Sequence, residues 1–157
     1  MLNEAQRTAL EELSSYFHRE EISWICIGGI AAIAWGAKRP LADIDILIGK
    51  KDIDKVSGHF EKETIANFRH YITKSWGIRQ TKIIINNVTI DVCQAEDFFI
   101  LNNGKKYRLD SYVNRPSLGE VAGITIPVLP KKELIRYKKL LGRDVDHIDL
   151  RQLENET

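Results

Sequence analysis

The sequence has little of several features that would place it at once in a broad class of protein. Its 157 residues include no apolar run near the roughly 18 residues of a membrane-spanning helix. The N-terminal segment lacks the basic-then-apolar pattern of a signal peptide. The two cysteines, Cys26 and Cys93, lie far apart in apolar stretches without Cys-x-x-Cys spacing, so we interpret them as buried thiols. These absences predict a cytoplasmic protein that does not enter a membrane.

The chain also lacks an excess of charge of one sign, an internal repeat and a low-complexity segment. Its 23 Lys and Arg against 22 Asp and Glu give a net charge of +1, which excludes a generally polybasic nucleic-acid binder. A composition of 43% hydrophobic and 29% charged residues is that of an ordinary globular protein. We therefore expect a single domain over 1–157, with a core at about 20–129 and a C-terminal helical tail at about 130–157.

Hydrophobic periodicity changes between helical and strand-like steps along the chain. Asn86-Asn87 favours a two-residue hairpin turn, because asparagine tolerates positive φ. Pro127 places its strand at a sheet edge, because proline cannot donate to a central ladder. The pattern predicts helices at 2–18, 30–35, 51–62, 96–101, 131–141 and 146–153, strands at 23–27, 43–48, 78–85, 88–92 and 124–129, and irregular structure at 105–120. This order indicates an α+β (or α/β) fold with a small mixed β-sheet flanked by helices.

Two carboxylates stand two positions apart on the predicted strand at 43–48. Asp43 and Asp45 therefore leave the same face of the sheet, about 6–7 Å apart, while the isoleucines between and after them supply the core. Like charges at this distance repel one another. A fold tolerates the pair at a solvated edge or around a cation, and the spacing alone does not choose between these.

Asp91 is the third candidate carboxylate. It stands between Ile90 and Val92, where an ionised side chain needs a partner unless that face of the hairpin is exposed. Three carboxylates would converge if the strand at 88–92 paired beside the strand at 43–48. Such oxygen ligands suit Mg²⁺ or Mn²⁺, which can clamp an in-line phosphoryl displacement.

The Gly28-Gly29 pair follows one predicted strand and opens a predicted helix. Free backbone N–H groups at such a turn can bind phosphate oxygens, although a tight strand-to-helix turn needs glycine for its own geometry.

Taken together, three segments resemble the nucleotidyltransferase superfamily that includes DNA polymerase β. They read Ile-Cys-Ile-Gly-Gly-Ile-Ala-Ala, then Arg-Pro-Leu-Ala-Asp-Ile-Asp-Ile-Leu-Ile, then Thr-Ile-Asp-Val. The resemblance covers 22–93 and extends more weakly over 134–150. It is nearest to small bacterial and archaeal members, including antibiotic-modifying and abortive-infection-type toxin proteins. It implies a nucleotidyltransferase-like fold with a C-terminal helical tail.

The resemblance also implies roles for particular residues. Gly28 and Gly29 would hold the triphosphate of an NTP, and Arg39 would stabilise phosphate charge or anchor its loop. Two departures concern the nucleotide geometry: Gly29 stands where some members have serine, and Leu41 where relatives often have threonine. The metal ligands and catalytic carboxylates would be Asp43, Asp45 and Asp91, with Asp91 helping to activate the attacking hydroxyl. The implied reaction transfers a nucleoside monophosphate to an acceptor that is a small molecule, a protein or RNA.

The predicted helix at 131–141 carries the only concentrated positive charge. Its lysines fit a solvated face that the acidic tail neutralises. In the alternative reading, Lys138 is the tail lysine of the family and reaches a phosphate or an anionic acceptor. Arg143 and Asp146 would form a local pair that fixes the last turn.

Other functions remain open at this stage. The fold could serve as a non-catalytic nucleotide-binding or regulatory module, for example within a toxin–antitoxin pair. A phosphodiesterase or nuclease could use the same carboxylates on water, although no histidine or lysine base accompanies the motifs. An exposed edge strand near Pro127 would permit a homodimer or a partner protein. Trp76 is interpreted as a core residue.

Overall fold

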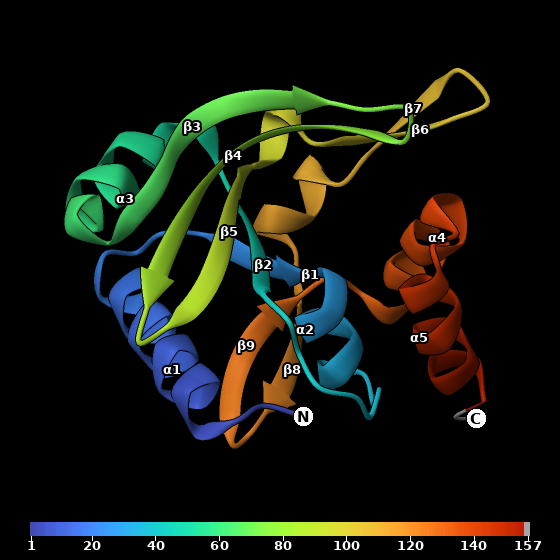
Figure 1. Cartoon of the computed structure of the whole chain (residues 1–157), viewed down its shortest axis with the longest axis horizontal. Coiled ribbons are helices and arrows are strands. Elements are labelled where there is room, and N and C mark those ends of the chain that lie inside the picture. The colour runs from blue at the N-terminus through green and yellow to red at the C-terminus, as the bar shows by residue number, and fades with distance from the viewer. Residues whose placement is uncertain (156–157) are drawn as a thin grey trace.

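The computed structural model describes residues 1–155, which form one mixed β-sheet with helices packed on both faces (Figure 1). The helices are α1 (Glu4–Arg19), α2 (Gly28–Ala34), α3 (Ile53–His59), α4 (Lys131–Leu141) and α5 (Asp144–Glu154). The strands are β1 (Trp24–Ile27), β2 (Ile44–Ile48), β3 (Thr64–Ile72), β4 (Trp76–Ile85), β5 (Val88–Gln94), β6 (Phe99–Asn102), β7 (Lys105–Arg108), β8 (Ser117–Val121) and β9 (Ile124–Val128). Short 3₁₀ turns lie at Lys50–Asp52, Glu61–Glu63, Ala95–Asp97 and Asp110–Asn114.

Within this range the strand order is β7-β6-β4-β5-β2-β1-β9-β8, and β3 pairs with the other side of β4. Alternation along the central strands divides the apolar side chains between two cores. Ile44, Ile46 and Ile48 face the core that α1 and α3 cover, whereas Leu47 and Cys93 face the core beneath α4 and α5. The predicted mixed sheet with flanking helices and a C-terminal helical tail is thus confirmed.

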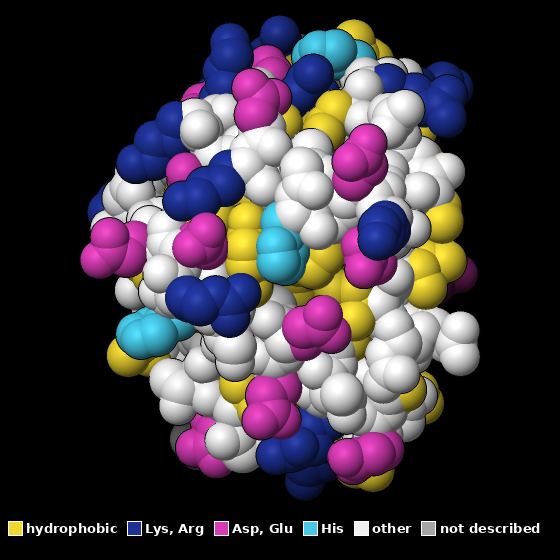
Figure 2. All heavy atoms as spheres, turned by 90° about the vertical axis from the view of Figure 1, so that its left-hand side faces the viewer, with side chains coloured by type: hydrophobic (Ala, Val, Ile, Leu, Met, Phe, Trp, Pro, Cys, Tyr) yellow, Lys and Arg dark blue, Asp and Glu magenta, His cyan; other side chains and the backbone are white. Residues whose placement is uncertain are grey.

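Helix α1 forms as the apolar spacing at 2–18 predicts. A capping box starts it: the Asn3 side chain accepts from the Gln6 backbone, and the Gln6 side chain accepts from the Asn3 backbone. Leu10, Leu13 and Phe17 are fully buried against the sheet. Figure 2, which faces the left-hand side of Figure 1, shows acidic and basic side chains interspersed on that surface. This distribution agrees with the nearly balanced charge of the chain.

The three central strands have the arrangement on which the carboxylate hypothesis depends. Strand β2 runs antiparallel to β1 and parallel to β5. In this register Asp45 lies opposite Ile27 on one side and opposite Asp91 on the other. The two carboxylate-bearing strands are therefore neighbours, which is the condition for their carboxylates to converge, and Asp45 and Asp91 leave the same face of the sheet.

The prediction of a helix at 96–101 is wrong. A 3₁₀ turn occupies Ala95–Asp97, and strand β6 follows and pairs with β7. Asn103 and Gly104 have positive φ and form the two-residue turn between these strands. An Asn-Gly dipeptide between apolar runs is a strong hairpin signal, and it outweighs the helical propensity of the preceding residues.

The regions around this hairpin also differ from the sequence prediction. Residues 105–120 are not irregular throughout, because they include β7 and β8. The strand at 124–129 is β9, and it lies between β1 and β8 rather than at an edge. Its only register pair with β1 joins Val128 to Cys26, so Pro127 is not required to donate there. Strand β3 was not predicted, because its residues alternate weakly and several are exposed.

Among the described residues, no helix combines the length and apolar character needed to cross a membrane.

Candidate active site

The turn between β1 and α2 brings two glycines against two charged side chains. Gly28 has φ of +63°, and a Cβ there would lie 2.8 Å from Asp45 Oδ2. A Cβ at Gly29 would lie 2.9 Å from Arg39 Nη2. A side chain at either position would therefore displace a charged group. Glycine is required at 28 for both its backbone conformation and this close approach.

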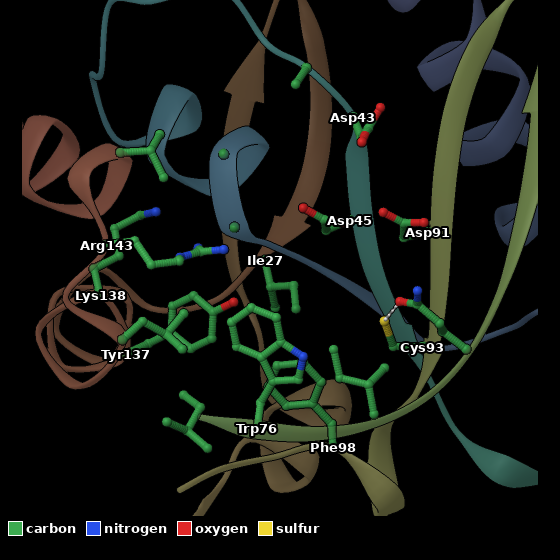
Figure 3. A pocket seen from close by; sticks show the side chains of 18 of the residues that line it. Ile27, Asp43, Asp45, Trp76, Asp91, Cys93, Phe98, Tyr137, Lys138 and Arg143 are labelled. Atoms are coloured by element: carbon green, nitrogen blue, oxygen red, sulfur yellow. Dashed lines mark hydrogen bonds between the residues drawn. The ribbon is translucent and has the colours of Figure 1, made fainter. Parts of the chain in front are cut away.

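The predicted carboxylates face a common cavity. Asp45 and Asp91 point toward the same space from neighbouring strands, and Asp43 lies above them at the start of β2 (Figure 3). Burial raises the pKa of Asp45 well above its usual range, and the charge of Asp91, a hydrogen bond with Asp91 and the charge of Asp43 raise it further. Burial is the largest cause of this shift in pKa, the neighbouring carboxylates add to it, and the charge of Lys82 offsets part of it.

A lysine that the sequence analysis missed supplies part of the compensating charge. Lys82 Nζ lies 2.5 Å from Asp91 Oδ1. Burial alone would lower the pKa of Lys82, but the hydrogen bond to Asp91 and the carboxylate charges raise it, so the ammonium stays protonated. The signal was present in the sequence: a two-residue turn at Asn86-Asn87 places Lys82 directly opposite Asp91 in the hairpin.

The donor set fits a hard divalent cation, because carboxylate oxygens are the ligands that Mg²⁺ and Mn²⁺ prefer and the cluster is short of positive charge. Within residues 1–155, no three His, Cys, Asp or Glu side chains already stand together as a ready-made metal site. The Lys82 ammonium is instead the cation in contact with Asp91. A metal at these carboxylates would therefore compete with Lys82 for Asp91.

The cavity has a volume of about 510 Å³ and two unlike ends. Gly28, Gly29, Arg39 and the carboxylates line one end. Aromatic and aliphatic side chains line the other: Trp76, Ile78, Phe98, Ile100, Tyr137 and Leu141. Trp76 is thus a partly exposed wall residue, and its interpretation as a core residue is wrong, because β4 begins there at the cavity rather than in either core.

A second charged cluster lies beneath the C-terminal helices. Lys138 Nζ lies 2.8 Å from Asp149 Oδ2 and 3.3 Å from Asp146 Oδ1, and all three side chains are essentially inaccessible to solvent. Arg39 donates to Asp149 from Nε at 2.6 Å and from Nη2 at 2.9 Å. Arg143 donates to Asp146 in the same two-pronged way. We call these five residues the tail cluster.

The tail cluster changes how two predicted residues are understood. Lys138 lines the cavity, but its ammonium is directed to two aspartates, so its nucleotide-binding role stays a prediction. Asp149 fixes the guanidinium of Arg39 beside Gly29. The pair of Arg143 and Asp146 is confirmed, and it caps the first turn of α5. Asp149 itself was missed, because its partner Arg39 is 110 residues away in the sequence.

The sheet, its helices and the carboxylate-lined cavity define a nucleotidyltransferase-like fold. No family model and no curated protein match the sequence. Among solved structures, TM1012 of Thermotoga maritima, a protein assigned to the nucleotidyltransferases, has a TM-score of 0.77 and 19% identity over 100% of this chain and 97% of its own.

Two antibiotic-modifying proteins are also similar in structure. The lincosamide antibiotic adenylyltransferase LnuA, solved with lincomycin bound, has a TM-score of 0.61 and 19% identity over 94% of this chain and 96% of its own. The antibiotic-resistance factor ANT(2″)-Ia has a TM-score of 0.60 and 14% identity over 98% of this chain and 83% of its own. Identities this low show a common fold and leave the activity to be argued from the site.

Proposed function

We propose that this protein is a metal-dependent nucleotidyltransferase that moves a nucleoside monophosphate from an NTP to an acceptor hydroxyl and releases pyrophosphate. The observation that carries the proposal is the pairing of Asp45 with Asp91 on adjacent parallel strands, both facing a cavity beside the Gly28-Gly29 turn. Proteins of the same fold that transfer adenylyl groups to antibiotics support this reaction class.

The predicted residues other than Lys138 then have these roles. Asp43, Asp45 and Asp91 would hold one or two Mg²⁺ or Mn²⁺ ions, which would neutralise phosphate charge and orient the reacting groups. Gly28 and Gly29 leave room for the triphosphate to approach the backbone. Arg39, held in place by Asp149, directs positive charge to the same region. These groups favour the reaction by positioning and electrostatics rather than through a covalent intermediate.

The reaction is a single in-line displacement at the α-phosphorus. The acceptor oxygen forms the new P–O bond as the bond between the α-phosphorus and the bridging oxygen of the β-phosphate breaks. The electron pair of that bond leaves with pyrophosphate, and Asp91 takes the proton of the acceptor hydroxyl. Lys82 holds the Asp91 carboxylate through the ion pair as long as no metal takes its place.

The experiment that tests the proposal uses α-labelled ATP, CTP, GTP and UTP with Mg²⁺ and a whole-cell lysate as the source of acceptors. We expect label to enter one class of molecule with release of pyrophosphate. Asp45→Asn and Asp91→Asn should each lower the transfer rate by at least about 10²-fold, because each removes a charge that the transition state requires. Asp54→Asn, at an exposed position on α3, is the matched control and should leave the rate unchanged. Full transfer by both site variants would overturn the proposal.

The ion pair between Lys82 and Asp91 favours a second candidate, a non-catalytic module in which the lysine permanently replaces the metal. Calorimetry with Mg²⁺ and each NTP separates the two. The enzyme binds at least one NTP in a magnesium-dependent way, whereas a module of this kind binds none.

A further inference from the structure

The hydroxyl of one largely buried side chain remains accessible from the cavity and has no hydrogen-bond partner among the described residues. Tyr137 is 7% exposed, and no hydrogen bond joins its hydroxyl to any residue that the structure describes. The hydroxyl points from α4 into the cavity, toward the side occupied by Asp45 (Figure 3). A buried polar group without a partner costs free energy, so a group that remains accessible to a cavity is a natural contact for a ligand.

The cavity that this hydroxyl faces is lined by several apolar side chains and by polar ones that include Thr73, Gln80 and Arg143. We call Trp76, Ile78, Phe98, Ile100, Tyr137 and Leu141 the apolar chamber. The rings of Phe98 and Tyr137 lie 6.2 Å apart and nearly parallel, and the Arg143 guanidinium lies 5.4 Å from the Trp76 ring. Flat rings with one or two directed polar groups are typical of small-molecule sites.

The chamber lies on the far side of the carboxylates from the Gly29 turn. Cys93 follows Asp91 by two residues on the same face of β5, and the chamber begins at this level of the sheet. Arg39 and Gly29 lie at the opposite end of the cavity. In an in-line displacement the incoming oxygen and the leaving pyrophosphate stand on opposite sides of the phosphorus. If the triphosphate lies along Gly29 and Arg39, the acceptor enters from the chamber.

We infer that the apolar chamber is the acceptor subsite, and that it takes a small molecule whose hydroxyl is attached to an apolar ring system. This inference rests on the proposed function, which places pyrophosphate at the Gly29 end. Strand β6 and helix α4 contact each other beside the chamber, and the whole cavity, nucleotide end included, has a volume of about 510 Å³. A cavity of this size that must also hold the nucleotide leaves room for a compact acceptor rather than a polymer strand.

The hydroxyl of Tyr137 gives the chamber its polar contact. Burial raises the pKa of this phenol far above its usual range, and the charge of Asp45 raises it further, so the group stays protonated. It therefore donates a hydrogen bond to an oxygen or nitrogen atom of the acceptor. One such hydrogen bond contributes about 1 kcal/mol, or roughly fivefold in affinity.

The test separates the chamber from the nucleotide end with two ligands. The first is 4-methylumbelliferone, a flat fluorescent molecule with a hydroxyl on a fused ring, titrated by fluorescence. The second is each NTP with Mg²⁺, titrated by calorimetry. Ile78→Trp fills the chamber and Tyr137→Phe removes only the hydroxyl. Ile84→Trp, on the same strand outside the cavity, and Tyr107→Phe, on β7, are the matched controls.

We expect wild type to bind the probe, Ile78→Trp to weaken it at least tenfold and Tyr137→Phe to weaken it roughly fivefold, with NTP binding and both controls within twofold of wild type. A single-stranded RNA hexamer should not displace the probe. Equal losses of probe and NTP would assign the chamber to the base and overturn the inference. Displacement by RNA, or equal probe binding by all variants, would also overturn it. Chamber-specific probe binding without any NTP binding would instead reject the proposed function.

Discussion

One group of aspartates lines the cavity and a second group pairs with cations that line it, and the two groups differ in the positive charge beside them. On the central strands, three carboxylates (Asp43, Asp45 and Asp91) have one cation nearby, Lys82, which contacts Asp91. In the tail cluster, two carboxylates (Asp146 and Asp149) share three cations (Arg39, Lys138 and Arg143). The second group is fully compensated within the protein, whereas the first is not.

The pKa directions follow this difference. Burial and neighbouring carboxylates raise the pKa of Asp45. Burial alone would also raise the pKa values of Asp146 and Asp149, but hydrogen bonds and charges from Arg143, Lys138 and Arg39 lower both. A buried aspartate therefore does not by itself indicate a functional site. A functional site is indicated instead by a carboxylate whose negative charge is not balanced by neighbouring cations.

The largest expected effect comes from removing the central cation of the tail cluster. Lys138→Met should lower the free energy of unfolding by about 3 kcal/mol, because it leaves two inaccessible carboxylates with less compensation. Urea denaturation at pH 7 measures the loss. Lys139→Met provides the control: this neighbouring lysine is more than half exposed and its pair with Glu154 spans 3.4 Å, so the change should stay within about 0.5 kcal/mol. Similar small losses in both variants would show that the tail cluster does not stabilise the fold.

A smaller effect concerns pH. The lowered pKa values of Asp146 and Asp149 mean that their pairing contributes stability above the ordinary carboxyl pKa of about 4, and that this contribution is lost as pH falls through the lowered values. The double variant Asp146→Asn with Asp149→Asn should therefore be less stable than wild type at pH 7. The two unfolding free energies should converge only below about pH 4, as measured by urea denaturation from pH 7 to pH 2. A constant difference across this range would contradict ionic pairing as the source of stability.

The group formed by Asp43, Asp45 and Asp91 on the central strands was predictable from the sequence because its geometry is local. Alternation on one strand places Asp43 and Asp45 on one face, and a two-residue turn fixes the register of the hairpin that carries Asp91. The same turn also implies Lys82 opposite Asp91, a consequence that the sequence analysis did not draw. The prediction of a helix failed where a short apolar run precedes Asn103-Gly104, because such a run fits a strand and a helix equally well.

The tail cluster could not be predicted, apart from the pair of Arg143 and Asp146. The contact between Arg39 and Asp149 spans 110 positions and depends on how α4 and α5 dock on the sheet. No periodicity encodes this docking. The same is true of the apolar chamber, whose walls come from β4, β6 and α4 and whose residues resemble ordinary core residues in the sequence. Sites whose residues meet only through tertiary packing thus form no sequence motif, even when the residues themselves are charged or aromatic.

The smallest expected effect also gives the sharpest contrast between the two groups. An Asp→Asn substitution should raise the free energy of unfolding in one group and lower it in the other. In magnesium-free buffer at pH 7, Asp45→Asn should raise the free energy of unfolding by about 1 kcal/mol, because the amide removes an uncompensated charge and keeps nearly the same shape. Differential scanning calorimetry should record a rise in Tm of about 2–4 °C. Asp149→Asn should instead lower Tm, because it breaks the bidentate contact with Arg39 and the contact with Lys138. A fall in Tm for Asp45→Asn would mean that the charge of Asp45 is already balanced within the protein, and the physical reason for expecting a cation between Asp45 and Asp91 would be lost.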